Sequence, residues 1–325
     1  MTPTRIKEVL DKLLDEIWPV FIWGAPGVGK SSLVREVASD RNLRVIDVRA
    51  PLLDPTDIRG VPSVFEGKAV WSPPSFLPTD GEGLLFFDEL NAAPPLVQAS
   101  LYQLTLDRAV GEYHLPDGWR IVAAGNRAQD ASIVHRMPAA LANRFVHLDF
   151  EVSIEDWRGW AIKNRINPLI VGFLGTRPDL LFDMQNIERA FPTPRSWHML
   201  SDALKGFKKV AESLDVLIGI VGEGAAIEFV GYTAEALSEE AIKSIIENPS
   251  GCDLPEEVGD QYALISYLAH KANDTRVRKA AGVLLDRFSP ELSVLLARDM
   301  LRANAKFAVD PAYLAFAAKH QEFLQ

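Results

Sequence analysis

The stretch from Gly24 to Ser31 constrains the fold of this chain more than any other part of the sequence. It fits the phosphate-binding pattern G-x-x-x-x-G-K-[ST] at every fixed position. Before it, residues 20–23 form an apolar run that is typical of a buried parallel strand. After it, apolar residues recur at helical spacing among charged ones. The sequence therefore predicts a strand, a glycine-rich loop and a helix, in that order.

This order suits the binding of a polyphosphate. Glycines let the backbone curl so that its N–H groups point inward, and the helix N-terminus adds unpaired donors and a partial positive charge. We expect the Lys30 ammonium to reach the β- and γ-phosphates and the Ser31 hydroxyl to bind Mg²⁺. The candidate nucleotide-binding residues are Gly24, Ala25, Pro26, Gly27, Val28, Gly29, Lys30, Ser31 and Ser32.

A second apolar run, residues 83–87, ends in two carboxylates, Asp88 and Glu89. In open α/β sheets ligands bind outside the carboxyl ends of the strands, so we expect both carboxylates near the glycine-rich loop. Asp88 would hold Mg²⁺, directly or through water, and Glu89 would orient and deprotonate the attacking water. An Asp-Glu pair alone is more often a solvated turn, and the upstream phosphate loop is what favours the catalytic interpretation.

A third strand is predicted over residues 120–125 and ends at Asn126. The Asn126 amide is placed to hydrogen-bond the γ-phosphate or the attacking water. An asparagine after a strand is usually a turn residue. Its position relative to the other two strand ends favours the catalytic role here.

Strand and helix signals alternate from about residue 20 to residue 150, which predicts an α/β fold with a doubly wound parallel sheet. From residue 151 onward the patterns are mostly helical. We therefore predict an α/β domain over residues 1–150, an α-helical domain over residues 151–250 and a C-terminal helical extension over residues 251–325.

Two hairpins are predicted inside the α/β domain. Residues 61–77 hold two β-prone pieces around Glu66-Gly67, and the prolines that bracket them indicate an insertion and not a core strand. Residues 109–119 are turn-rich and form the second candidate. The segment between the hairpins, residues 95–108, is predicted to be a helix with an inner face of Leu96, Leu101, Leu104 and Thr105.

Composition excludes several classes of protein. The formal net charge is −10, which disfavours a protein that wraps nucleic acid through phosphate contacts. No apolar run approaches the ~20 residues that a membrane span needs, and the N-terminus lacks the apolar core of a signal peptide. Cys252 is the sole cysteine, so no internal disulfide can form and a cytoplasmic protein is expected.

On these motifs the sequence resembles an AAA+ ATPase and, within that group, the MoxR family. The loop at residues 24–31 is similar to the Walker A motif, and residues 84–89 are similar to Walker B. Asn126 corresponds to sensor 1 of that family. The likeness spans about residues 20–200, and the C-terminal third carries no motif that we can match.

Two arginines and one insertion extend this resemblance. Arg144, in Asn143-Arg144-Phe145, is similar to the arginine finger, and Arg195, in Thr193-Pro194-Arg195, is similar to sensor 2. Two cations at the γ-phosphate would stabilise the charge of a phosphoryl-transfer transition state. Arg127 and Arg136 are competing candidates for the finger. The hairpin at residues 61–77 resembles the helix-2 insert of the clade that holds MoxR, magnesium chelatase, McrB and dynein-like proteins.

The resemblance implies Mg²⁺-dependent hydrolysis of ATP to ADP and phosphate in a homo-oligomeric ring, expected to be hexameric. It makes residues 151–250 the lid, with Arg195 acting on its own subunit's site and Arg144 on the neighbour's. It also implies chaperone-like remodelling of a protein client, often with a partner that carries a von Willebrand factor A domain.

Two other functions compete with this one. If the chain were a nucleic-acid-associated NTPase motor of the McrB kind, we would expect basic residues on the inserted hairpin. Lys68 is the only cation there, and the acidic Glu66 lies two residues before it. A nucleotide-gated scaffold with little turnover is disfavoured by the presence of both Glu89 and Asn126. The sequence does not separate ATP from GTP, or identify the client.

Overall fold

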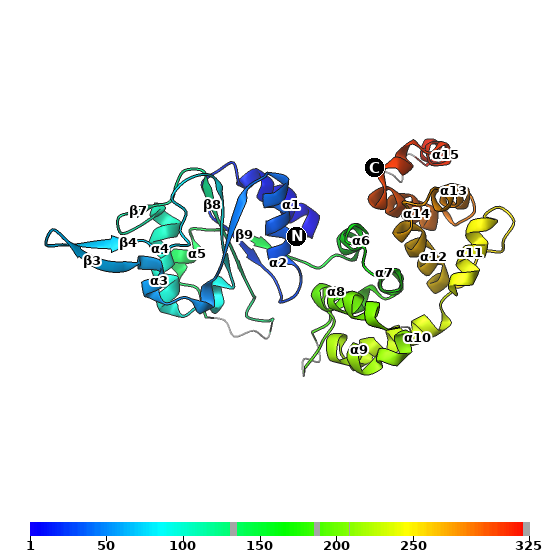
Figure 1. The fold of residues 1–325 in the computed structure, drawn as a ribbon, viewed down its shortest axis with the longest axis horizontal. Coiled ribbons are helices and arrows are strands. Elements are labelled where there is room, and N and C mark those ends of the chain that lie inside the picture. Colours follow the sequence, from blue (N-terminus) through cyan, green and yellow to red (C-terminus); the bar gives the residue numbers. More distant parts are fainter. Residues whose placement is uncertain (131–134, 185–188, 208, 321–325) are drawn as a thin grey trace. The chain divides into compact units, whose positions relative to one another are not determined.

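The chain is described from a computed structural model that defines residues 1–130, 135–184, 189–207 and 209–320 (Figure 1). It divides into two compact units, Met1–Val152 and Ser153–Gln325, which are described separately below. The predicted further division of the second unit at residue 250 stays a prediction.

A five-stranded parallel sheet forms the centre of the first unit. Its strand order is β2-β5-β8-β1-β9, and every neighbouring pair is parallel. The strands are β1 (Val20–Trp23), β2 (Arg44–Arg49), β5 (Gly83–Asp88), β8 (Trp119–Gly125) and β9 (Val146–Asp149). The predicted doubly wound parallel sheet is confirmed.

Helices cover both faces of this sheet (Figure 1). On one face lie α1 (Pro3–Leu13) and α2 (Lys30–Asp40), and on the other lie α3 (Pro55–Arg59), α4 (Pro95–Asp107) and α5 (Ala139–Ala142). Because both faces are covered, the central strands are largely buried, and all six residues of β5 are buried, whereas the edge strands β2 and β9 keep exposed polar residues. The carboxyl ends of the strands are left to carry polar groups.

The inner face of α4 differs from the prediction at one residue. Leu101 and Leu104 are fully buried and Thr105 is 4% exposed, as predicted, but Leu96 is 72% exposed. The buried stripe begins at Val97, which is 1% exposed. At 3.6 residues per turn, Val97, Leu101 and Leu104 share one face, while Leu96 lies in the first turn and points away from it.

Both predicted hairpins are present. The first pairs β3 (Val61–Phe65) with β4 (Lys68–Ser72). Its turn residues Glu66 and Gly67 have positive φ angles of 49° and 75°, which matches the turn type that suits the twist of a two-residue hairpin. The second hairpin pairs β6 (Ala109–Val110) with β7 (Tyr113–His114).

The described residues of the second unit contain helices and no strand, in agreement with the helical patterns of the sequence. Its α-helices are α6 (Ile154–Lys163), α7 (Pro168–Thr176), α8 (Pro194–Ala203), α9 (Leu214–Val221), α10 (Glu223–Glu235), α11 (Glu239–Glu247), α12 (Val258–His270), α13 (Thr275–Leu284), α14 (Pro290–Ala303) and α15 (Pro311–Lys319). None of the helices in the described part of the chain has the length and apolarity needed to span a bilayer.

Helices α7 and α12 pack closely because α7 carries a glycine at their contact. A Cβ atom on Gly172 would lie 3.2 Å from Ala263 Cα and 2.6 Å from Tyr232 Oη. Backbone atoms cannot move aside as a flexible side chain can, so a larger residue would push the two helices apart.

We predict that Gly172→Ala lowers the free energy of unfolding by ~1–3 kcal/mol, because it overpacks this contact. Gly231→Ala in α10 is the matched control, since a Cβ there meets no atom within 4 Å. The control should be stabilised by up to ~1 kcal/mol through helix propensity. Urea unfolding of both variants measures the difference, and equal effects would contradict the packing described here.

Candidate active site

The glycine-rich loop joins the end of β1 to the start of α2, as the sequence predicts. Gly27 and Gly29 have φ angles of 77° and 107°, which residues other than glycine rarely adopt. Gly24 lies so near β9's end that a Cβ atom there would be 3.0 Å from Phe150 Cβ. Backbone conformation therefore favours glycine at Gly27 and Gly29, and the close approach of Phe150 favours it at Gly24.

The Lys30 ammonium lies at the centre of this loop. Its Nζ donates hydrogen bonds to the carbonyl oxygens of Gly24 and Ala25, at 2.5 and 2.9 Å. It also donates to Asn126 Oδ1 at 2.9 Å. Lys30 is only 8% exposed, so its charge is held by these oxygens and not by bulk water. The sheet order explains the last contact, because β1 and β8 are neighbours and both end here.

Asp88 is joined to the loop through Ser31. The Ser31 hydroxyl donates to Asp88 Oδ2 at 2.7 Å, and Asp88 is 4% exposed. Its other oxygen, Oδ1, accepts the backbone N–H of Glu89 at 3.0 Å. The phosphate loop, Asp88 and Asn126 thus meet at the carboxyl ends of three parallel strands.

Arg49 also contacts Asp88, and sequence reasoning missed it. Its Nη1 lies 3.0 Å from Asp88 Oδ2, the same oxygen that accepts from Ser31. Arg49 ends β2 and is the direct cross-strand partner of Asp88 in the parallel register. The register of β2 against β5 was the signal for this contact, and the sequence alone does not supply it. Any cation that binds Asp88 Oδ2 must compete with Arg49.

Glu89 lies next to these groups along the chain, at the turn that follows β5. It is exposed and has a φ of 56°, a left-handed conformation that is strained for a residue with a side chain. Its carboxylate makes no hydrogen bond or ion pair with the residues that the structure describes. Strained residues cluster at functional sites, and the free carboxylate is available to a ligand.

Asn91 is the second residue that the sequence did not reveal. Its Nδ2 donates to the Asn126 carbonyl oxygen at 2.7 Å, and its Oδ1 accepts from the Asn126 N–H at 3.2 Å. Asn91 is 3% exposed. Gly125 makes room for it, because a Cβ atom on Gly125 would lie 2.3 Å from Asn91 Oδ1. Asn91 therefore fixes the backbone from which the Asn126 amide reaches Lys30.

The candidate finger arginines differ in their surroundings. Arg144 follows α5, is half-buried, and donates to Tyr102 Oη at 3.3 Å with its guanidinium 5.8 Å from that ring's centre. Arg127 is held within the first unit by Asp149, at 3.3 Å, and by the Phe150 carbonyl, at 2.9 Å. Arg136 is exposed.

Arg195 belongs to the second unit, where it is exposed in the first turn of α8. Thr193 and Ser196 cap this helix by binding each other's backbone N–H groups. A cation in the first turn opposes the helix dipole, which costs ~0.3–1 kcal/mol. Helix stability therefore does not explain an arginine at this position.

The oxygen atoms of Ser31 and Asp88 are suitable ligands for Mg²⁺. Magnesium prefers oxygen donors and is commonly held by one or two protein groups together with substrate phosphates. The described residues contain no cluster of three or more His, Cys, Asp or Glu side chains that could hold a metal alone. The donor set here fits a metal ion that is shared with a phosphate ligand.

We predict that Asn91→Ala lowers the free energy of unfolding by ~1–3 kcal/mol, because it leaves buried polar groups of Asn126 unpaired. Asn143→Ala, at an exposed residue of the same unit, should change it by less than ~0.5 kcal/mol. Denaturant titration of both variants checks this difference. Similar small effects would show that Asn91 does not hold Asn126.

Comparison with known proteins addresses the first unit most directly. A family model described as an AAA domain of the dynein-related subfamily matches residues 19–145. No curated protein matches the sequence. Among solved structures the chain is similar to NtrX from Brucella abortus, at 15% sequence identity and a TM-score of 0.39, covering 98% of this chain and 67% of that chain.

Two further solved structures are similar to a comparable degree. A RuvB variant from Thermotoga maritima has 18% identity and a TM-score of 0.39, over 88% of this chain and 85% of that chain. A complex of Brucella abortus NtrX with ATP has 14% identity and a TM-score of 0.39, over 98% and 67% of the two chains. No conclusion about this chain rests on these three likenesses. By its sheet order, its glycine-rich loop and the family model that matches it, the first unit has the AAA P-loop NTPase fold.

Proposed function

We propose that this chain is a Mg²⁺-dependent ATPase that hydrolyses ATP to ADP and phosphate. One observation carries the proposal: Lys30, Asn126 and the Ser31–Asp88 pair meet at the carboxyl ends of neighbouring parallel strands. Phosphoryl transfer uses an ammonium and a hydroxyl at the start of a helix, together with a carboxylate and an amide nearby. The matched AAA domain supports the same assignment.

Each of these groups has a distinct role in the proposal. Lys30 exchanges its loop carbonyls for phosphate oxygens and neutralises their charge, while N–H groups of the loop bind the phosphates. The Glu89 carboxylate accepts a proton from the attacking water, and the Asn126 amide orients that water or the γ-phosphate. Ser31 and Asp88 would hold Mg²⁺, which neutralises developing phosphate charge when it is bound. Arg49 would then release Asp88.

We propose a homo-oligomeric ring, hexameric in the simplest case, in which subunits complete one another's sites. Arg144 would act on the neighbouring subunit, with Arg136 as its competitor, and Arg195 would act on its own. Arg127 is less suitable, because Asp149 and the Phe150 carbonyl already bind its guanidinium. A finger that comes from a neighbour links turnover to assembly, so hydrolysis could drive subunit movement.

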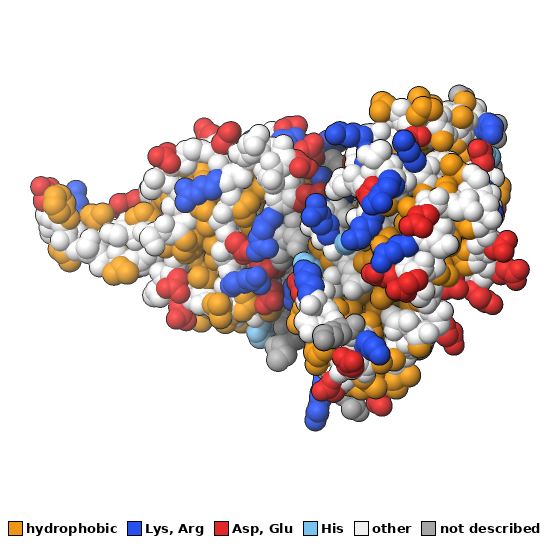
Figure 2. All heavy atoms as spheres, turned by 45° about the vertical axis from the view of Figure 1, so that its right-hand side comes forward, with side chains coloured by type: hydrophobic (Ala, Val, Ile, Leu, Met, Phe, Trp, Pro, Cys, Tyr) orange, Lys and Arg blue, Asp and Glu red, His pale blue; other side chains and the backbone are white. Residues whose placement is uncertain are grey.

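The inserted hairpin supports a protein client. Val64 and Phe65 are 81% and 67% exposed, and Figure 2 shows hydrophobic side chains along the projecting ribbon. Exposed apolar patches mark protein contacts, whereas a nucleic-acid motor needs cations, of which this hairpin carries only Lys68. We therefore favour chaperone-like, MoxR-type remodelling in the cytoplasm over the McrB-like alternative. A partner with a von Willebrand factor A domain is the client class that this assignment suggests.

We predict that Glu89→Gln still binds ATP but hydrolyses it ~10²–10⁴-fold more slowly, because the amide cannot accept the proton. Glu82→Gln, an exposed substitution just before β5, should hydrolyse at the wild-type rate. Phosphate release and nucleotide binding are measured for ATP and GTP, each with and without DNA. Wild-type turnover by Glu89→Gln would refute the catalytic assignment, and stimulation by DNA would favour the McrB-like function.

We predict that Arg144→Ala loses ~10³-fold or more in hydrolysis, as expected for a finger residue. Mixing it with Lys30→Ala subunits should restore part of the activity, because the second variant supplies the finger to intact sites of the first. The same mixture made with Arg136→Ala is the control. No recovery with Arg144→Ala would contradict action in trans, and recovery only with Arg136→Ala would reassign the finger.

A further inference from the structure

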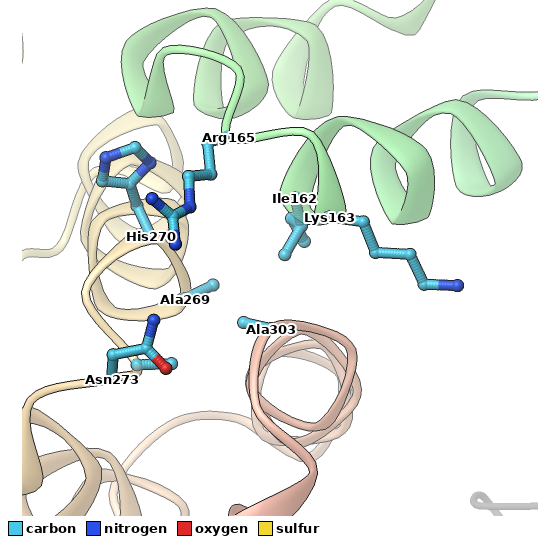
Figure 3. A pocket seen from close by; sticks show the side chains of 8 residues that line it. Ile162, Lys163, Arg165, Ala269, His270, Asn273 and Ala303 are labelled. Carbon is cyan, nitrogen blue, oxygen red and sulfur yellow. The ribbon is translucent and has the colours of Figure 1, made fainter.

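The second unit contains a pocket where the ends of three helices meet. Its volume is about 130 Å³, well above the ~10–15 Å³ that one water needs. It lies at the C-terminal ends of α6, α12 and α14, and Figure 3 shows its walls. Its lining includes Ile162, Arg165, Ala269, His270, Asn273 and Ala303. No acidic side chain is among the described residues that line it.

Arg165 holds a backbone conformation that normally selects glycine. Its φ is 56°, and it ends α6 in a Schellman motif: Ile166 N–H bonds to the Ala161 carbonyl at 2.9 Å, and Arg165 N–H to the Ile162 carbonyl at 3.2 Å. Glycine is favoured at this position because a Cβ atom strains the left-handed backbone. An arginine here therefore costs backbone stability, and its attraction to the negative end of the α6 dipole offsets part of that cost.

A second arginine with a positive φ angle makes side-chain hydrogen bonds that offset its backbone strain. Arg108 ends α4 with a φ of 53°, and its Nη2 donates to the carbonyls of Pro116 and Trp119, both at 2.9 Å. The Arg165 side chain is exposed and makes no hydrogen bond or ion pair with the described residues. In Figure 3 its side chain extends toward the pocket beside His270, while Lys163 points away. Unlike Arg108, the Arg165 side chain thus has no hydrogen-bonding partner within the described chain.

The other polar side chains that line the pocket also carry N–H groups. Burial, Lys271 and Arg165 together lower the pKa of His270 below its usual value, burial having the largest effect. Asn304 donates to Asn273 Oδ1 at 3.0 Å, which leaves the Asn273 amide nitrogen to face the pocket (Figure 3). The helix-end carbonyl of Ala272 is already occupied by Arg278, at 2.8 Å. The described side chains that line the pocket thus supply no carboxylate to balance Arg165, and the partial negative charge of the helix C-termini is what favours cations there.

The helices that form the pocket are held together directly behind it. Arg158 of α6 bonds to Asp299 of α14 at 2.6 Å and to Ser266 of α12 at 3.1 Å. Arg158 is 3% exposed and Asp299 is fully buried. A buried ion pair of this kind is costly to break, so the three helix ends keep their spacing. The pocket thus lies between helices that a buried ion pair holds together.

We propose that this pocket binds a small oxyanion, a phosphate or carboxylate group, through the Arg165 guanidinium, the His270 imidazole and the Asn273 amide. Arginine binds such groups through two parallel N–H bonds, and an imidazolium adds a charge-assisted one. A bound anion would pair with the Arg165 guanidinium, which has no partner among the described residues, and would favour the protonated form of His270. This assignment does not depend on the proposed ATPase activity.

The test follows the imidazole resonance of His270 by NMR in the full chain, identified by its loss in His270→Gln. Inorganic phosphate, added at constant ionic strength, should raise the pKa of His270, because a bound anion favours the imidazolium. The shift should persist in Lys30→Ala, which removes phosphate binding at the glycine-rich loop. A parallel titration with acetate reports whether a carboxylate, as carried by an acidic side chain, is accepted as well.

Arg165→Gly separates this function from a structural role. It should abolish the response to phosphate while raising the melting temperature, since glycine relieves the backbone. Arg276→Gln, at a highly exposed arginine paired with Asp274, is the control and should keep the response. No phosphate response in the wild-type chain, or the same response in Arg165→Gly, would overturn the proposal. A lower melting temperature with the response intact would show that Arg165 stabilises the helix ends and does not bind the anion.

Discussion

The hydrogen bond between Lys30 Nζ and Asn126 Oδ1 is the contact on which the first unit's site depends. It joins two loops that are far apart in the sequence and adjacent only because β8 is inserted between β1 and β5. A strand order that separated β1 from β8 would leave the ammonium without its amide partner. The doubly wound topology is therefore not a neutral scaffold here, since the order of its strands decides which side chains can meet.

A second layer of contacts holds this pair and its neighbour Asp88 in place. Asn91 fixes the backbone of Asn126 through two hydrogen bonds, and Arg49 shares with Ser31 the Asp88 oxygen that a metal ion would use. The first contact is rigid and buried, whereas the second ends in a half-exposed arginine that can exchange. One side of the site is thus fixed and the other can respond to a ligand.

The sequence was sufficient for the features that a short contiguous motif encodes. The glycine-rich loop, the strand that ends in Asp88 and the turn at Glu66-Gly67 depend on neighbours in the chain, so their spacing predicts them. Arg49 and Asn91 could not be found in this way, because their partners are set by strand register and by a contact across 35 residues. Leu96 was assigned to the wrong face because an apolar residue in a first helical turn looks the same in sequence whether it is buried or exposed.

The hairpin of β3 and β4 is a two-stranded ribbon that projects from the first unit (Figure 1). A ribbon of two strands has little stability of its own, and its residues from Val61 to Ala69 are all exposed. Its shape away from the sheet is set mainly by the Glu66-Gly67 turn and by the anchor at Gly60, where a Cβ atom would collide with the Ser72 carbonyl. Because so few contacts hold such an arm, we expect it to bend about its base, which would let one sequence fit surfaces of differing contour.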